Sequence, residues 1–180
     1  MRVTAFLYVG IFAVSGLACS QGMAQATSAK FDCDTGSGSF SDLDLPQSGP
    51  SYHISGSISV KKLRPSSDWY PVANVRLVSG DKRTFGGIRL QIPEASRPPE
   101  LVVQSAVGSG ANDSPAGVLG KGEVAPFSID VIGGKMTIRF GDRAFAGPDV
   151  GTAATIQITC SSGEFLFENL DWAPSQSPRS

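Results

Sequence analysis

Hydrophobic and polar residues alternate with a period of two along several short stretches of the chain. The clearest stretch is residues 52–60, in which His53 and three serines alternate with apolar side chains. Successive side chains of a β-strand point to opposite faces, so this stretch has one polar and one apolar face. The apolar face consists of Tyr52, Ile54, Ile58 and Val60. Beyond the N-terminal segment no helical periodicity is sustained, and the pattern predicts an all-β protein.

Seven further stretches are predicted as strands, with turn residues recurring about every ten residues. They are residues 75–79, 84–92, 101–107, 127–132, 135–140, 155–161 and 164–172. Gly133 and Gly134 predict a tight hairpin, because its backbone needs a positive φ that glycine reaches without steric cost. Residues 161–163 are expected to close the last hairpin, whereas 93–99 and 108–122 are interpreted as long exposed loops. This spacing of short strands and turns is typical of a two-sheet antiparallel β-sandwich.

The first 26 residues have the pattern of a secretory signal peptide. Arg2 gives a positive start, residues 3–17 form an apolar run, and Ala24-Gln25-Ala26 is a small-x-small cleavage site. We therefore expect a periplasmic or secreted protein cleaved after Ala26. The alternative is a lipoprotein anchored through Cys19, which follows the small residue Ala18.

The rest of the chain has the size of one domain. We expect a β-sandwich at residues 27–172 and a flexible tail at 173–180. The whole chain has 15 Lys and Arg against 16 Asp and Glu, a net charge of −1. Nucleic acid and anionic membranes both require a basic face, so neither is expected as the main partner. No later segment approaches the ~20 apolar residues of a transmembrane span.

Two cysteines, Cys33 and Cys160, remain after the signal peptide. In an oxidising compartment such a pair is expected to form a disulfide. The bridge would place the first strand beside one of the last strands. Two separately buried thiols are the alternative.

Three stretches resemble the concanavalin A-like jelly roll, the sandwich of legume lectins, laminin G-like modules and several polysaccharide-active enzymes. Residues 75–80 resemble a strand that runs into a glycine turn, and residues 127–138 a paired hairpin. Residues 165–170, with two Phe, an Asn and a Leu, resemble the closing strand of that fold. The resemblance implies a jelly roll, on which sugar binding, protein binding and hydrolysis all occur.

The enzyme branches of this superfamily have patterns that the chain lacks. Retaining glucanases carry Glu-x-Asp-x-x-Glu on one strand, so that two carboxylates lie about 5 Å apart in one cleft. The last predicted strand instead spaces its acids as Glu164, Glu168 and Asp171. The alginate-lyase branch needs an Arg-rich strand and a paired Gln and His on another, which is also missing. The sequence therefore predicts no catalytic residues.

Other polar residues favour structural interpretations. His53 is the only histidine in the chain, and we expect an exposed or hydrogen-bonded imidazole rather than a catalytic base. No His and Cys residues are spaced as zinc ligands. Residues 112–114 and 147–149 are interpreted as turns rather than calcium sites, because each offers a single carboxylate. No metal and no cofactor are expected.

Residues 61–71 form the predicted loop with the most candidate ligand-binding side chains. Two adjacent aromatic residues and nearby cations could present stacking faces and hydrogen-bond donors to a ligand. The candidate ligand-binding residues are Lys61, Lys62, Arg64, Trp69 and Tyr70. The alternative is that Trp69 or Tyr70 folds inward and caps one end of the sandwich.

Together these observations predict an exported, non-catalytic binding or accessory module whose candidate ligand is carbohydrate. Two alternatives stay open. The first is a polysaccharide-active enzyme with an atypical cleft, and the second is a structural or adhesive envelope protein that binds another protein.

Overall fold

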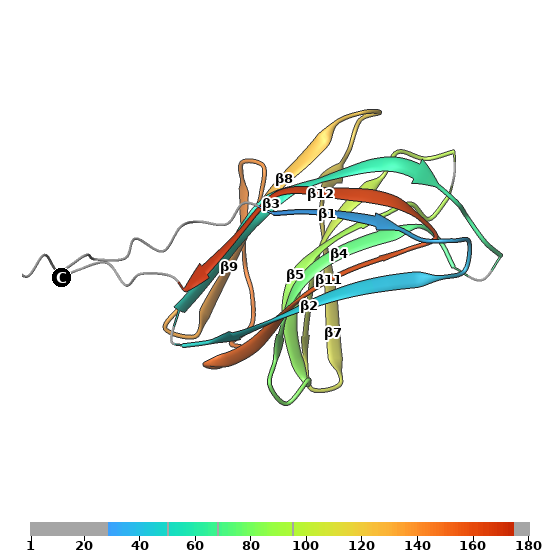
Figure 1. The fold of residues 1–180 in the computed structure, drawn as a ribbon. Helices are drawn as coiled ribbons and strands as arrows, with labels where there is room; N and C mark the ends of the chain where they lie inside the picture. The colour runs from blue at the N-terminus through green and yellow to red at the C-terminus, as the bar shows by residue number, and fades with distance from the viewer. Residues whose placement is uncertain (1–28, 50, 68, 95, 175–180) are drawn as a thin grey trace, which may run out of the picture.

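The computed structural model describes residues 29–49, 51–67, 69–94 and 96–174. These residues form two antiparallel sheets of six strands each, packed face to face as a β-sandwich (Figure 1). None of them is helical, and so none forms a helix that could cross a membrane. The all-β sandwich prediction is confirmed.

Sheet A contains the first and the last strand of the domain. Its first and last strands in the sequence, drawn blue and red in Figure 1, lie side by side. In spatial order its strands are β1 (Ala29–Asp34), β12 (Gly163–Pro174), β3 (Ser51–Leu63), β8 (Val124–Ile132), β9 (Lys135–Phe140) and β10 (Arg143–Ala146).

Sheet B contains the middle of the chain together with two strands from near its ends. In spatial order its strands are β2 (Phe40–Ser48), β11 (Ala153–Ser161), β4 (Val72–Ser79), β5 (Thr84–Gln91), β6 (Glu100–Val107) and β7 (Gly110–Val118). Strands β4 to β7 form a meander, because each pairs with the next one along the chain.

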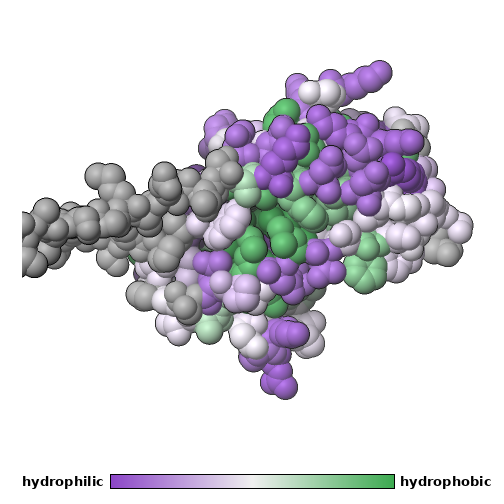
Figure 2. Space-filling model, viewed as in Figure 1, coloured by the Kyte–Doolittle hydropathy of each residue, from purple (hydrophilic) through white to green (hydrophobic). Residues whose placement is uncertain are grey.

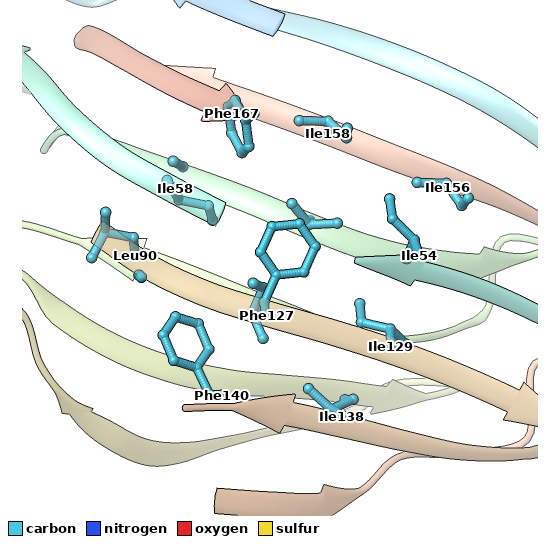
Figure 3. Close-up of a cluster of buried hydrophobic side chains, with 14 of the residues drawn as sticks. Ile54, Ile58, Leu90, Phe127, Ile129, Ile138, Phe140, Ile156, Ile158 and Phe167 are labelled. Carbon is cyan, nitrogen blue, oxygen red and sulfur yellow. The ribbon is translucent and has the colours of Figure 1, made fainter. Parts of the chain in front are cut away.

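The core lies between the sheets and consists mainly of branched aliphatic and phenylalanine side chains. Figure 3 shows these side chains projecting from strands of both sheets into one layer. Sheet A contributes Ile54, Ile58, Phe127, Ile129, Ile138, Phe140 and Phe167, and sheet B contributes Leu90, Ile156 and Ile158. Strands such as β4, β8 and β9 bury every second residue, so their other side chains are left on the outer faces.

The disulfide joins the two sheets. Cys33 in β1 and Cys160 in β11 are bonded, and both are 1% exposed. The bridge spans 127 residues of sequence. The predicted pairing is therefore confirmed, and the alternative of two buried thiols is wrong.

Several boundaries differ from the sequence predictions. Residues 108–122, interpreted as a loop, contain strand β7 at the edge of sheet B. Strand β12 ends at Pro174, two residues into the segment interpreted as a tail. Strand β1 was predicted only as a first strand that carries Cys33, without bounds, and strands β2 and β10 were not predicted. The proposed signal peptide and Cys19 lie outside the described residues.

The front side of the sandwich exposes part of the core. Figure 2 shows hydrophobic surface between the edges of the two sheets, where β1 and β2 run in Figure 1. Strand β1 contributes Phe31 to the core margin, and β2 contributes Leu43 and Leu45, all of them partly buried. Leu43 and Leu45 point inward. Asp42 and Asp44 alternate with them along β2 and therefore point to the outer face of sheet B.

One buried tyrosine ties the sandwich to the loop before β11. The Tyr52 side chain is 1% exposed, and its hydroxyl donates a hydrogen bond to the carbonyl of Gly151. Burial, and next the nearby Asp149 carboxylate, raise the pKa of Tyr52 above its ordinary value of 10.0. The neutral phenol is therefore the form that the folded state favours.

A Tyr52→Phe variant is expected to lose about 1 kcal/mol of unfolding free energy at neutral pH, because the hydrogen bond to Gly151 is lost. A pKa that is raised on folding contributes stability below the unfolded value, and this stability is lost as pH rises through the folded value. Urea unfolding from neutral pH to above pH ~10 should therefore show a shallower alkaline decline for the variant. Parallel declines in the two proteins would contradict this role.

Candidate functional site

The outer face of sheet B is hollowed into a groove of about 650 Å³. Its floor consists of side chains that point away from the core on five neighbouring strands, and its end wall is aromatic. The groove is lined by Phe40, Asp42, Trp69, Tyr70, Val72, Asn74, Arg76, Arg89, Gln104, Gln157, Thr159, Cys160 and Ser161.

Strand register assembles the first row of floor residues. Thr159 on β11 lies opposite Asn74 on β4, and Asn74 lies opposite Arg89 on β5. The Asn74 side-chain nitrogen donates to the Thr159 hydroxyl at 3.0 Å. The Asn74 side-chain oxygen is buried and accepts no hydrogen bond from the described residues. A buried acceptor of this kind favours a donor from a ligand.

A second row crosses the sheet two residues further along. Gln157 on β11 lies opposite Arg76 on β4, and Arg76 lies opposite Gly87 on β5. The Arg76 Nε donates to Gln157 Oε1 at 2.8 Å, and its guanidinium lies 5.3 Å from the centre of the Phe85 ring. A Cβ at Gly87 would lie 2.2 Å from the carbonyl oxygen of Val75, so the close approach of β4 and β5 requires glycine here.

The Arg76 guanidinium stays charged although it is partly buried. Burial lowers the pKa of Arg76, and the nearby Asp44 carboxylate opposes this by raising it. Because the ordinary pKa of arginine is far above neutrality, the guanidinium stays charged. It is therefore a fixed hydrogen-bond donor on the floor of the groove.

Arg89 is held by two neighbours on the side of β6 and β7. It forms an ion pair with Asp113 on β7. With its amide oriented to satisfy both groups, the Gln104 side-chain oxygen accepts from Arg89 Nη1 and Nε at 2.7 and 3.0 Å. Gln104 is itself 6% exposed. These contacts fix the guanidinium in one orientation.

Aromatic side chains close one end of the groove. Trp69 and Tyr70, in the connection between β3 and β4, are 46% and 45% exposed. The Trp69 ring stacks on Phe40 of β2 with 6.2 Å between ring centres and 12° between planes. The Trp69 backbone N–H also donates to the Ser66 hydroxyl at 3.0 Å. The ring is thus held by Phe40 and the backbone by Ser66, while much of the ring surface stays open to solvent.

The groove continues into a second hollow of about 330 Å³ along the same face. The two hollows share Arg76 and Gln157, which lie between them. The far end of the second hollow is bounded by Ser79 and Lys82 in the turn between β4 and β5. From Val72 to Val78 on β4 the combined track covers six residue steps, or about 20 Å of strand.

The predicted ligand-binding residues fall into two groups. Trp69 and Tyr70 line the groove, and neither caps the core. Lys61 and Lys62 belong to β3 of sheet A rather than to a loop, and both are exposed. Arg64 bonds Asp34 at 2.5 Å and the carbonyl of Thr35 at 3.0 Å. These three cations do not line the groove.

The floor residues were missed because their partners are far apart in the sequence. Arg76 and Arg89 lie inside predicted strands, which are recognised by the apolar residues on either side of them. The signal was the set of planar polar side chains on the second face of these strands. That signal becomes a site only when strand order places Asn74 beside Thr159 and Arg76 beside Gln157.

The other candidate residues have structural partners. His53 lies on the outer face of sheet A, where its Nδ1 is 2.6 Å from the Asp130 carboxylate, which also bonds Arg139 at 2.6 Å. The only histidine is thus on the sheet opposite the groove. Asp113 pairs with Arg89, and Asp149 accepts from the N–H of Gly151 at 2.8 Å. Among the described residues, no group of three His, Cys, Asp or Glu could hold a metal ion.

No family model and no curated protein sequence matches the chain. Solved structures do match over about three quarters of it. A functionally unknown protein from Saccharomyces cerevisiae aligns with a TM-score of 0.55 at 11% identity, covering 75% of each chain. An alginate lyase from Alteromonas sp. 272 aligns with 0.53 at 9% identity, covering 71% of this chain and 73% of its own. Carbohydrate-binding module CBM66 from Bacillus subtilis gives 0.50 at 12%, covering 75% and 84%.

At these identities the matches show the fold alone. Together with two antiparallel six-stranded sheets, they establish the concanavalin A-like jelly roll that the sequence resemblance implied. The groove lies on an outer face of that sandwich, and its function depends on its own residues rather than on the fold.

Proposed function

We propose that this protein binds carbohydrate in the groove on the outer face of sheet B and does not act on it chemically. The observation that carries the proposal is an open aromatic surface at the end of a floor of ordered planar polar groups. Trp69 supplies the aromatic surface, and Asn74, Arg76, Arg89 and Gln157 supply donors and acceptors.

Sugar rings combine hydroxyl groups with apolar C–H faces, and the groove provides for both. Aromatic rings offer flat apolar surface at low entropic cost. Amides and guanidiniums hold several donors and acceptors in one plane, matching adjacent hydroxyls. The floor groups are already held by Thr159, Gln157 and Gln104, so little conformational entropy is lost on binding.

We propose that the protein is periplasmic or secreted. The Cys33–Cys160 disulfide supports it, since such bridges persist in oxidising compartments. We propose cleavage after Ala26, with attachment through Cys19 as the alternative. Both would bring the groove into contact with extracellular or envelope glycans.

A Trp69→Ala variant is expected to bind its glycan about tenfold or more weakly, equivalent to ~1.4 kcal/mol. Stability should fall by only about 1 kcal/mol, because the ring is 46% exposed and its main packing partner is Phe40. A glycan array should identify the ligand. Titration calorimetry and thermal unfolding on the same variant should then separate affinity from stability.

Ile132→Ala is the matched control. It removes an apolar side chain that is 53% exposed at the β8–β9 turn of sheet A, away from the groove, and should leave affinity unchanged. Equal losses in both variants would contradict a binding role for Trp69. Release of shortened sugar chains during incubation would support the enzyme alternative, and absence of any glycan on the array would favour a protein-binding module.

A further inference from the structure

The outer face of sheet B carries more carboxylates than its arginines can balance. Two guanidiniums line the groove, those of Arg76 and Arg89. Four carboxylates lie on this face. Asp42, Asp44 and Asp113 line the track or bond its arginines, whereas Glu100 bonds Gln91 outside both hollows. Lys82 adds a cation only at the far end of the second hollow. The track as a whole therefore has no excess of positive charge.

Each guanidinium is also neutralised locally. Arg89 is ion-paired with Asp113. Asp44 interacts electrostatically with Arg76, and both residues pair with Gln157 in the register of β11. An anionic sugar that approached either arginine would have to compete with the carboxylate already there.

Two of these carboxylates face the ligand path. Asp42 lines the groove near its aromatic end, and Asp44 lines the second hollow. Like charges at close range in a partly desolvated groove repel more strongly than in bulk water. A chain of uronate or sulfated sugars would meet this repulsion along its length. Uncharged hydroxyls, in contrast, can donate to these carboxylates and accept from the arginines.

We propose that the ligand is a neutral, linear polysaccharide lying along the track formed by the two hollows. This inference rests on the proposed function and narrows its substrate class. The track of about 20 Å is long enough for several sugar units. It is open at the top along the sheet, so an internal part of a chain can enter without a free end.

The test compares neutral with anionic oligosaccharides. Full exported protein is titrated calorimetrically with linear glucan, xylan, mannan and galactan oligosaccharides, and with alginate and polygalacturonate oligosaccharides of equal length. Titrations are run at about 0.01 M and 0.15 M ionic strength. We expect at least one neutral series to bind, with an affinity that changes less than about twofold between the two salt concentrations. We expect no measurable binding of the uronates.

A double variant, Asp42→Asn with Asp44→Asn, tests the charge argument at constant side-chain size. It should raise uronate affinity at low salt by about tenfold or more and weaken neutral binding several-fold. The control, Asp32→Asn with Asp142→Asn, changes net charge equally at exposed positions of β1 and the β9–β10 turn in sheet A. It should change neither affinity.

The outcomes separate the two proposals. Salt-sensitive binding of uronates by the unmodified protein, without neutral binding, would overturn the neutral substrate class and leave carbohydrate binding intact. Equal gains in uronate binding by both double variants would mean that only net charge matters, which contradicts the local argument. Failure of every neutral and anionic series to bind would overturn the proposed function itself.

Discussion

Removal of the Cys33–Cys160 disulfide is expected to lower the free energy of unfolding by about 2 to 5 kcal/mol. The bridge closes a loop with a sequence separation of 127 residues, so it restricts the unfolded chain strongly. It also joins β1 of sheet A to β11 of sheet B, which no backbone ladder connects. The loss would be a large part of the ~5–15 kcal/mol that stabilises a typical domain.

The measurement is urea unfolding of a Cys33→Ala, Cys160→Ala double variant against the oxidised protein. Reduction of the unmodified protein with dithiothreitol should produce a similar shift, because both treatments remove the same crosslink. A midpoint unchanged by either treatment would contradict the structural role of the bridge.

Replacement of Phe167 by Ala is expected to cost about 3 to 5 kcal/mol. The side chain is 0% exposed in the central layer of sheet A, opposite Phe31 on β1 and Ile58 on β3. Its ring also stacks on Phe31, with 5.8 Å between ring centres. Truncation removes this contact and leaves a cavity that the surrounding strands, fixed by their ladders, fill only in part.

Two further variants serve as comparisons for Phe167→Ala. Phe167→Leu keeps most of the volume and should cost less than half as much, about 1.5 kcal/mol. Phe40→Ala removes the same side chain at a position that is 64% exposed and should cost at most about 1 kcal/mol. Similar unfolding midpoints for Phe167→Ala and Phe40→Ala would show that this layer is not the centre of the core.

Much of the fold could be predicted from local pattern, because strands with one buried face alternate visibly. Residues 52–60 and the hairpin at Gly133 and Gly134 lie where the sequence placed them. Strand β7 was missed because its sequence, GANDSPAGV, consists largely of turn-forming residues. An edge strand tolerates them, since one side of its backbone needs no partner.

The site was harder to predict than the fold. Trp69 and Tyr70 could be found because two adjacent aromatics in a polar segment are visible locally. The floor could not, because Asn74, Arg89 and Thr159 become neighbours only through the order and register of β5, β4 and β11. Each polar residue is visible in the sequence, but the strand pairing that brings them together is not.

Amide chemical-shift mapping with a neutral oligosaccharide tests the central claim most directly, because it locates the ligand on the molecule. We expect saturable shifts concentrated on β4, β5 and β11, around Asn74, Arg76 and Arg89, together with the Trp69 indole. The outer face of sheet A around His53 should be unaffected. Shifts centred on sheet A, or no shifts with any neutral oligosaccharide of the panel, would contradict the assignment of the groove as the binding site.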